Sequence, residues 1–176
     1  MNAFDTFSLT PALVLDLDNL RDIYQNLAAE NHPDKGGDKQ LFEKINLDYA
    51  ILRSPAKRIK AIMDHQGIEY DARGAVSNDL MDLFMLVGAL IQEADSFIRK
   101  KSAATSVLAK ALLEAESMEL QNKLSERIAT IESNQSKITE RFASPINDSE
   151  LPQIARNLSF LEKWQAQLQQ RYGSLF

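Results

Sequence analysis

The sequence predicts an all-helical protein, and the spacing of its apolar residues and its composition support that prediction. Apolar residues recur every three or four positions along most of the 176-residue chain, as on the buried face of an amphipathic helix. Alternating Val, Thr and Ile runs, which are typical of strands, are scarce, and six Gly and five Pro leave few helix breakers. With 44% apolar and 26% charged residues, the chain can form one globular domain or two small ones.

Capping residues divide the first 68 residues into four helical segments. Asp and Ser commonly begin helices because their side chains accept hydrogen bonds from the backbone amides of the first turn. Pro55 needs no donor in that turn, and Gly67 can adopt the left-handed conformation that ends a helix. The predicted segments are 3–9, Asp16 or Asp18 to about Asn31, Asp38 to about Arg53, and Ser54 to Gly67.

A tight loop with the sequence His32-Pro33-Asp34-Lys35-Gly36-Gly37 joins the second segment to the third. Pro33 disfavours helix at the residue before it, and the two glycines let the chain reverse without Cβ clashes. The flanking apolar residues imply two helices folded back on each other, which displays His32 and Asp34 at the tip of a hairpin. The alternative is a solvated loop in which the imidazole only caps a carbonyl.

A linker over 69–77 and an antiparallel three-helix bundle over 78–176 are predicted to follow the first 68 residues. The linker has little periodicity and ends at Ser77 or Asn78, either of which can cap a helix. The sequence leaves open whether the first bundle helix continues toward Leu113 or breaks at Lys100–Ser102. Ser144–Pro145 ends the second helix, and the third has heptad-like spacing.

Composition argues against several kinds of function. The chain has no Cys and only two His, so we expect no metal site and no bound cofactor. A net charge of -5 argues against a nucleic-acid partner, which needs a concentrated basic face. The apolar run Leu80–Ile91 contains Asp82 and is too short to span a bilayer, and no signal peptide is recognisable. These observations predict a cytoplasmic protein without a membrane partner.

The loop and its flanking helices resemble a J domain. In that family, the His-Pro-Asp loop and the preceding helix dock on the ATPase domain of a DnaK-type chaperone and stimulate ATP hydrolysis. The resemblance therefore implies a co-chaperone that has no catalytic residues of its own. Carried onto this chain, the chaperone-binding residues are His32, Pro33, Asp34, Lys35 and Arg21.

The second segment departs from the family pattern because it lacks a basic face. Acidic residues outnumber Arg21 there, although a basic helix would steer the protein toward an acidic chaperone surface. Docking is therefore expected either to be weaker or to use other cations, which could equally form a solvated rim. These cations are Lys35, Lys39, Lys57, Arg58 and Lys60.

Nearly the whole chain resembles the HscB/Jac-type co-chaperones of iron-sulfur cluster assembly. The similar features are a short chain without a Gly/Phe-rich or zinc region, the segment from Ser54-Pro55 through Arg58 to Gly67, and the residues Asn157 to Lys163. This resemblance implies that the bundle binds an IscU-type scaffold and delivers it to a DnaK/HscA-type chaperone. It places the scaffold-binding positions on Leu80, Met81, Phe84 and Phe160.

The first bundle helix has an unusually wide apolar surface. Positions 83, 87 and 90 are predicted to face the bundle, whereas Leu80, Phe84 and Met85 turn partly outward to form a surface that a partner covers. The alternative is that all of them belong to the core. Met85 and Gly88 stand where the family commonly has Glu, which predicts a more apolar patch.

The sequence is compatible with three alternative functions. The bundle could bind a different client for a general DnaK-type chaperone. An enzyme could use His32 with Asp34, or Asp64 with His65, but no nucleophile, metal set or phosphate-binding loop accompanies them. A structural coiled coil would need more heptads than the last helix has.

Overall fold

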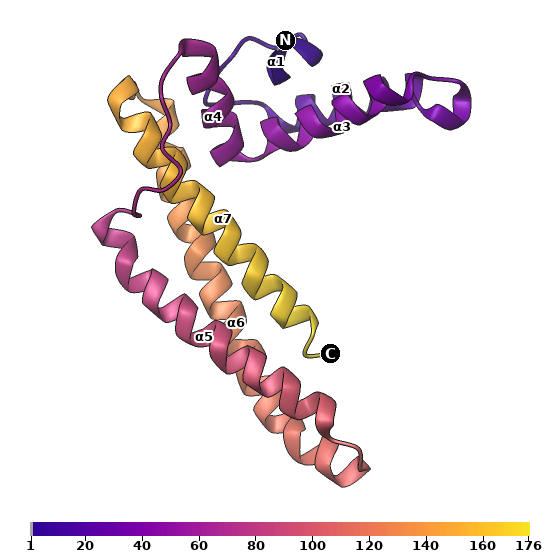
Figure 1. Ribbon diagram of the computed structural model, residues 1–176, viewed down its shortest axis with the longest axis vertical. Coiled ribbons are helices and arrows are strands. Elements are labelled where there is room, and N and C mark those ends of the chain that lie inside the picture. The colour runs from indigo at the N-terminus through magenta and orange to yellow at the C-terminus, as the bar shows by residue number, and fades with distance from the viewer. Residues whose placement is uncertain (1) are drawn as a thin grey trace. The chain divides into compact units, whose positions relative to one another are not determined.

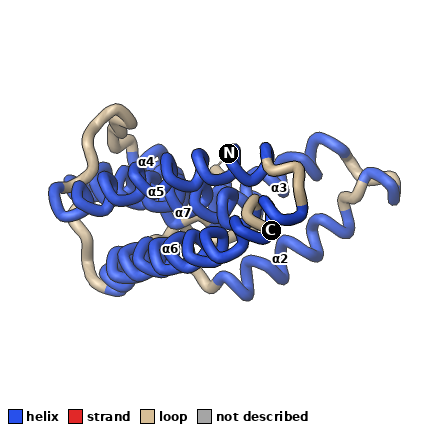
Figure 2. Tube along the Cα trace, turned by 90° about the horizontal axis from the view of Figure 1, so that it is seen from below, coloured by secondary structure: helices blue, strands red, loops and turns tan. Residues whose placement is uncertain are grey.

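The computed structural model describes residues 2–176, and the ordered elements in that range are all helical (Figures 1 and 2). Residues 2–176 form seven α-helices, three short 3-10 turns and no strand, which confirms the predicted fold class. The chain divides into two compact units, Met1–Gly74 with Thr139–Arg156, and Ala75–Ile138 with Asn157–Phe176. Within the described range, no helix combines the length and apolarity needed to cross a membrane.

Helix α3 is the central element of the first unit, because it contacts three other helices. The predicted helix ends are confirmed: Asp16, Asp38 and Ser54 accept hydrogen bonds from first-turn amides, and Gly67 is left-handed with φ 72°. The local capping signals therefore decide where these helices begin and end. Their bounds are α1 Ala3–Thr6, α2 Leu17–Glu30, α3 Lys39–Arg53 and α4 Pro55–Gln66.

The core of the first unit joins the N-terminal segment to the α2–α3 hairpin. Phe4, Leu20 and Leu52 are completely shielded from solvent, and Phe7 is 2% exposed. Burying a side chain of this size contributes about 1.5–3 kcal/mol. The first predicted segment, 3–9, therefore packs on the α2–α3 hairpin through Phe4 and Phe7. The buried members are Ala3, Phe4, Phe7, Leu20, Ile45, Leu52 and Ile62.

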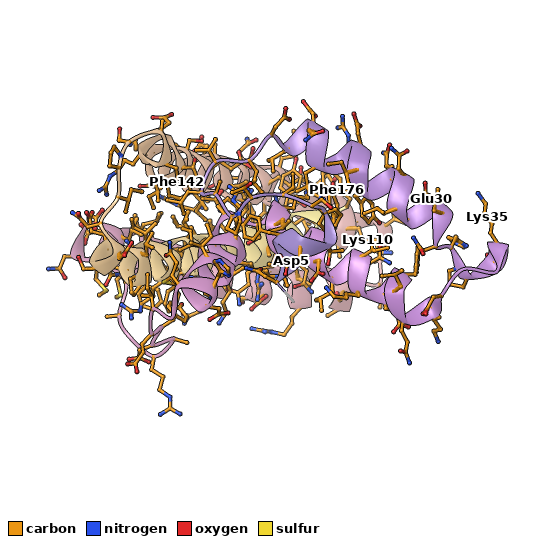
Figure 3. The ribbon with its side chains drawn as sticks, turned by 90° about the horizontal axis from the view of Figure 1, so that it is seen from above. Asp5, Glu30, Lys35, Lys110, Phe142 and Phe176 are labelled. Atoms are coloured by element: carbon orange, nitrogen blue, oxygen red, sulfur yellow. The ribbon has the colours of Figure 1, made fainter. Side chains whose placement is uncertain are left out.

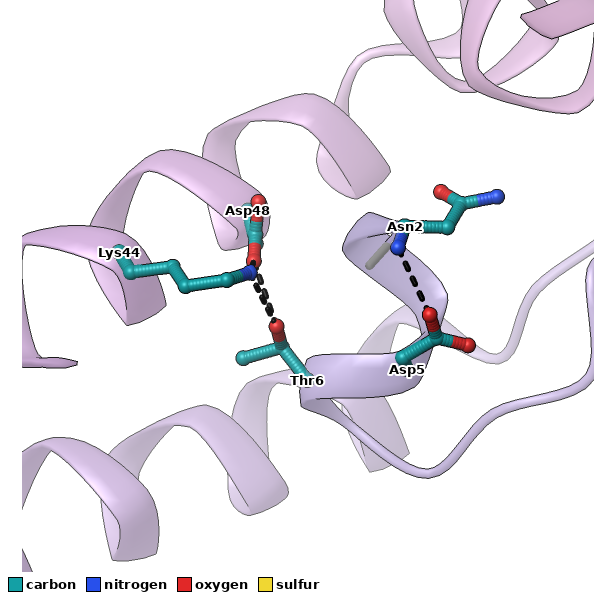
Figure 4. Close-up of polar contacts among 5 residues, drawn as sticks. All are labelled: Asn2, Asp5, Thr6, Lys44 and Asp48. Atoms are coloured by element: carbon teal, nitrogen blue, oxygen red, sulfur yellow. Dashed lines mark hydrogen bonds and ion pairs between the residues drawn. The ribbon is translucent and has the colours of Figure 1, made fainter. Parts of the chain in front are cut away.

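A polar cluster fastens α1 to α3 beside this core (Figure 4). The hydroxyl of Thr6 donates to the carboxylate of Asp48 at 2.6 Å, and the Lys44 ammonium donates to both Thr6 Oγ1, at 2.7 Å, and the same carboxylate. Asp48 is only 6% exposed. A buried carboxylate is tolerated when it is paired and hydrogen-bonded, so these partners are what allow Asp48 to lie inside.

The second unit contains α5 (Asn78–Ala103), most of α6 (Val107–Glu140) and the part of α7 (Leu151–Gly173) from Asn157 onward. The three helices share one apolar core with members on each of them. Helix α5 ends at Ala103, so the chain does break just after the Lys100–Ser102 segment. Helix α6 is followed by a 3-10 turn before Ser144–Pro145.

Polar contacts also connect the segments of the second unit. Arg171 on α7 makes a two-pronged ion pair with Asp95 on α5, at 2.8 and 3.0 Å. The Asn157 side chain accepts from the Ser77 amide at 3.1 Å and donates to the Ser77 hydroxyl at 2.8 Å, which fixes the start of α5 on α7. The Lys101 ammonium bonds the Leu175 carbonyl.

Replacing Leu52 with Ala should destabilise the first unit by about 2–5 kcal/mol, because the side chain is fully buried in its core. Leu47 is the matched control: it lies on the same helix but is 62% exposed, so Leu47→Ala should change the free energy of unfolding by less than about 0.5 kcal/mol. Urea unfolding followed by circular dichroism measures both. Equal effects of the two variants would contradict the assigned core.

Candidate functional site

The α2–α3 hairpin presents the loop at its far end, and aromatic packing holds its two helices together. The rings of Tyr24 and Tyr49 stack with centroids 4.0 Å apart and an interplanar angle of 12°. The Tyr24 hydroxyl also donates to the Asn46 side chain at 2.8 Å. Stacked pairs add about 0.5–1.5 kcal/mol to the burial of their surfaces, so this pair stabilises the helical hairpin close to the loop.

The loop itself is a single 3-10 turn, Pro33–Lys35, closed by backbone hydrogen bonds. The amides of Lys35 and Gly37 both donate to the His32 carbonyl, at 2.9 and 3.1 Å. The two glycines are required for different reasons. Gly36 has φ 81°, whereas a Cβ on Gly37 would lie 2.2 Å from the backbone of Asn31.

The imidazole of His32 is held on two sides. Its Nδ1 accepts a hydrogen bond from the Asp34 amide at 3.2 Å, and its ring meets Phe42 edge-on with centroids 5.1 Å apart. Because Nδ1 acts as an acceptor, the neutral ring carries its proton on Nε2. The Asp34 carboxylate is 89% exposed. The loop therefore presents an oriented imidazole N–H beside a solvated carboxylate.

A hollow of about 480 Å³ lies next to the loop, with its lining drawn from α2, the turn and α3. On the α2 side the lining includes Ala28 and Ala29, whose small side chains leave the hollow open. Lys35 projects from the end of the hairpin (Figure 3). Ala29 was not predicted as part of the site, because a small exposed residue does not contribute to the apolar periodicity of a helix. The full lining is Tyr24, Ala28, Ala29, His32, Asp34, Lys35 and Phe42.

Arg58 was expected among the docking cations, and this expectation is wrong. Its side chain is 5% exposed and donates to the Leu52 carbonyl at 2.9 Å. That carbonyl lies near the end of α3, where the last helical carbonyls lack partners within their own helix. Arg58 therefore supports the turn from α3 to α4 and is not available to a partner.

The other expected cations lie at or near the surface. Arg21 is exposed but pairs with Asp18 at 3.1 Å, so its charge is partly compensated within α2. Lys60 sits over the ring of Tyr70, 4.7 Å from its centroid. Lys35 and Lys57 are exposed.

The prediction that Leu80 turns partly outward is also wrong. Its side chain is 2% exposed and belongs to the core of the second unit. The helical repeat explains its position: residues three and seven positions further on, Leu83 and Val87, are buried on the same face. Met81 and Phe84, by contrast, are 39% and 41% exposed. The prediction that Phe84 turns partly outward is confirmed.

An apolar patch on α5 consists of Met81, Phe84 and Met85, the last of which is 66% exposed. Beneath it, the buried ring of Trp164 lies 5.6 Å from Phe84 and 5.8 Å from the half-buried Phe160. Trp164 was not predicted as part of this surface. Trp164 fixes both phenylalanine rings from below, so the patch has a rigid aromatic base.

Across residues 2–176, no group of three or more His, Cys, Asp or Glu side chains is arranged to hold a metal ion.

Comparisons with known proteins place the chain near one family, although no family model matches it. It is 35% identical over 78 residues to a co-chaperone protein HscB homolog of Neisseria meningitidis, a match covering 39% of this chain and 47% of the relative. It is 36% identical over 70 residues to a DnaJ protein homolog of Cucumis sativus, covering 38% and 16% respectively. The chain is a distant homologue of the J-domain co-chaperones.

The matches cover only parts of these J-domain proteins. This chain spans about half the length of the HscB homologues that it matches, since 47% of the Neisseria meningitidis protein is covered. Its 44% identity with chaperone protein dnaJ A6 of Oryza sativa subsp. japonica extends over 41 residues and 10% of that protein. The relatives are co-chaperones, and the family is not enzymatic.

Gly37→Ala should displace the loop that follows His32, because the added Cβ would overlap the backbone of Asn31. We expect large changes in the amide resonances of residues 31–38. Gly173→Ala is the control, since a Cβ there meets nothing within 4 Å. A Gly37→Ala spectrum that matches wild type in this region would contradict the close approach.

Proposed function

We propose that this chain stimulates the ATPase of a DnaK/HscA-type chaperone through the loop His32–Pro33–Asp34. The geometry of that loop supports the proposal most directly. Its imidazole is oriented by the Asp34 amide and by Phe42, and its carboxylate faces solvent. A rigid, exposed pair of this kind can bind a partner without the entropic cost of ordering the loop on binding.

Charge on the hairpin suggests how docking is distributed. Because Arg21 is paired with Asp18, the α2 face offers little free positive charge. Lys39 is likewise paired, with Glu43 at 3.8 Å, so we assign the cationic part of docking to Lys35 at the tip, assisted by Lys57. Contacts between exposed charges mainly raise the association rate and weaken with salt.

We further propose that the second unit binds an IscU-type iron-sulfur scaffold and delivers it to the chaperone. The surface would consist of Met81, Phe84, Met85 and Phe160, without Leu80. Aromatic and Met side chains are enriched in the buried centres of protein interfaces relative to the rest of the surface. The domain boundaries 1–68, 69–77 and 78–176, a J domain followed by a three-helix bundle, and a cytoplasmic location belong to the same proposal. Iron would stay with the scaffold.

A J-domain adaptor for another protein client is the second candidate. The character of the apolar patch favours it, since Met85 and Gly88 replace the carboxylates that the HscB/Jac-type resemblance led us to expect there. A scaffold pull-down separates the two candidates.

His32→Gln should abolish stimulation of the chaperone ATPase and leave the fold intact, because the side chain is 42% exposed and its main role is toward the partner. Single-turnover ATP hydrolysis by a DnaK-type chaperone measures the effect, and circular dichroism checks the fold. His65→Gln, at the exposed end of α4, should stimulate like wild type. Full activity of His32→Gln would disprove the J-domain mechanism for this chain.

Phe84→Ala and Met81→Ala should each weaken scaffold binding by about 1–3 kcal/mol and leave the melting temperature nearly unchanged, because both side chains are partly exposed. Leu80→Ala should instead lose about 2–5 kcal/mol of stability, since it lies in the core. Calorimetric titration with an IscU-type scaffold and thermal unfolding distinguish these effects. Unchanged affinity of Phe84→Ala would remove the scaffold from the proposal but not the chaperone.

A further inference from the structure

The second unit has an exposed apolar tip at the turn between α5 and α6. The last turns of α5 and the first turns of α6 extend past the C-terminal end of α7, so no third helix lies beside them (Figure 1). On the first turns of α6, Val107, Leu108 and Leu112 are 86%, 71% and 72% exposed. Several large apolar side chains exposed together mark a surface that binds another surface.

The same tip is cationic, although the whole chain carries a net charge of -5. Two of its cations are engaged: Lys100 pairs with Glu116 at 2.6 Å, and the Lys101 ammonium bonds the Leu175 carbonyl. Arg99 and Lys110 are exposed. A local excess of positive charge selects an anionic partner. Between positions 96 and 116 the charged residues are the cations Arg99, Lys100, Lys101 and Lys110 and the carboxylates Glu114 and Glu116, an excess of two positive charges.

We propose that this tip docks on an anionic lipid surface. Leu112 follows Val107 by five positions, so the two side chains lie about 140° apart around the helix axis. Leu113 occupies the inner side and is buried in the core of the unit. Val107, Leu108 and Leu112 thus leave a wide apolar surface outside the core, and the neighbouring Arg99 and Lys110 match it to a surface that combines anionic headgroups with an apolar interior.

Docking of this kind needs no membrane-spanning helix, so it departs from the prediction of no membrane partner, which rested on the lack of a spanning segment and of a signal peptide. Apolar side chains enter the boundary between headgroups and acyl chains, and nearby Lys and Arg side chains contact anionic headgroups. Neither contribution alone gives firm attachment, so binding should require both Leu108 with Leu112 and the cations Arg99 and Lys110. This inference is independent of the proposed co-chaperone function.

Flotation of the full chain with vesicles tests the proposal. We expect binding to vesicles that mix phosphatidylcholine with phosphatidylglycerol, release by high salt, and weak binding to phosphatidylcholine alone. The double variant Leu108→Ser with Leu112→Ser should reduce binding about tenfold or more. Lys110→Gln should reduce it about fivefold, the contribution of one cation near an anionic surface.

Leu47→Ser is the matched control, since Leu47 is 62% exposed on α3 of the other unit and should not affect vesicle binding. Val107→Ser provides a second test of the tip if the double variant unfolds. The proposal is overturned if the wild-type chain does not float, if the double variant floats like wild type, or if salt has no effect. A concentration-dependent dimer that depends on Leu108, without vesicle binding, would assign the tip to a second copy of the chain.

Discussion

The packing of α2 against α3 is the interaction on which the candidate site depends. Ordering the backbone of a residue costs about 1–2 kcal/mol, and each hydrogen bond in the loop returns only about 0.5–1.5 kcal/mol. The short turn Pro33–Lys35 is therefore not stable on its own. Buried Leu20 and Ile45, the Tyr24–Tyr49 stack and the contact of His32 with Phe42 extend the hairpin's packing to its tip.

A single helix serves two purposes in the second unit. One face of α5 supplies core residues such as Leu83 and Val87, while a neighbouring face exposes Phe84 and Met85. The buried ring of Trp164 connects the two, because it belongs to the core and also supports Phe84. A substitution on the exposed face can therefore change partner binding with little effect on the core, which is the property expected of a binding surface on a rigid element.

Much of the fold could be predicted because it is encoded by local interactions. The caps Asp16, Asp38 and Ser54 and the stop Gly67 act within one helical turn, so the sequence reveals them directly. Burial depends on the turn of a helix toward its neighbours, which a sequence pattern specifies less well. Leu80 was misplaced for this reason.

Polar contacts between distant segments were the least predictable part of the structure. Arg58 looks like a surface cation until its distance to the Leu52 carbonyl is known. Lys44 and Asp48 lie four residues apart on α3, a spacing that the sequence shows, but nothing in the sequence joins either of them to Thr6 on α1. The sequence predicted that His32 and Asp34 lie in a loop at the end of a helical hairpin. The contacts of the imidazole with the Asp34 amide and with Phe42 are visible only in the structure.

Amide NMR of the labelled chain, titrated with the ATPase domain of a DnaK-type chaperone, tests the central claim most directly. Docking through the loop predicts that the perturbed amides cluster at Asn31–Asp38 and on the side of α2 that carries Ala28 and Ala29. The amides around Phe84 on α5 should change little. Perturbations confined to the second unit, or absent from the loop at saturation, would contradict the account.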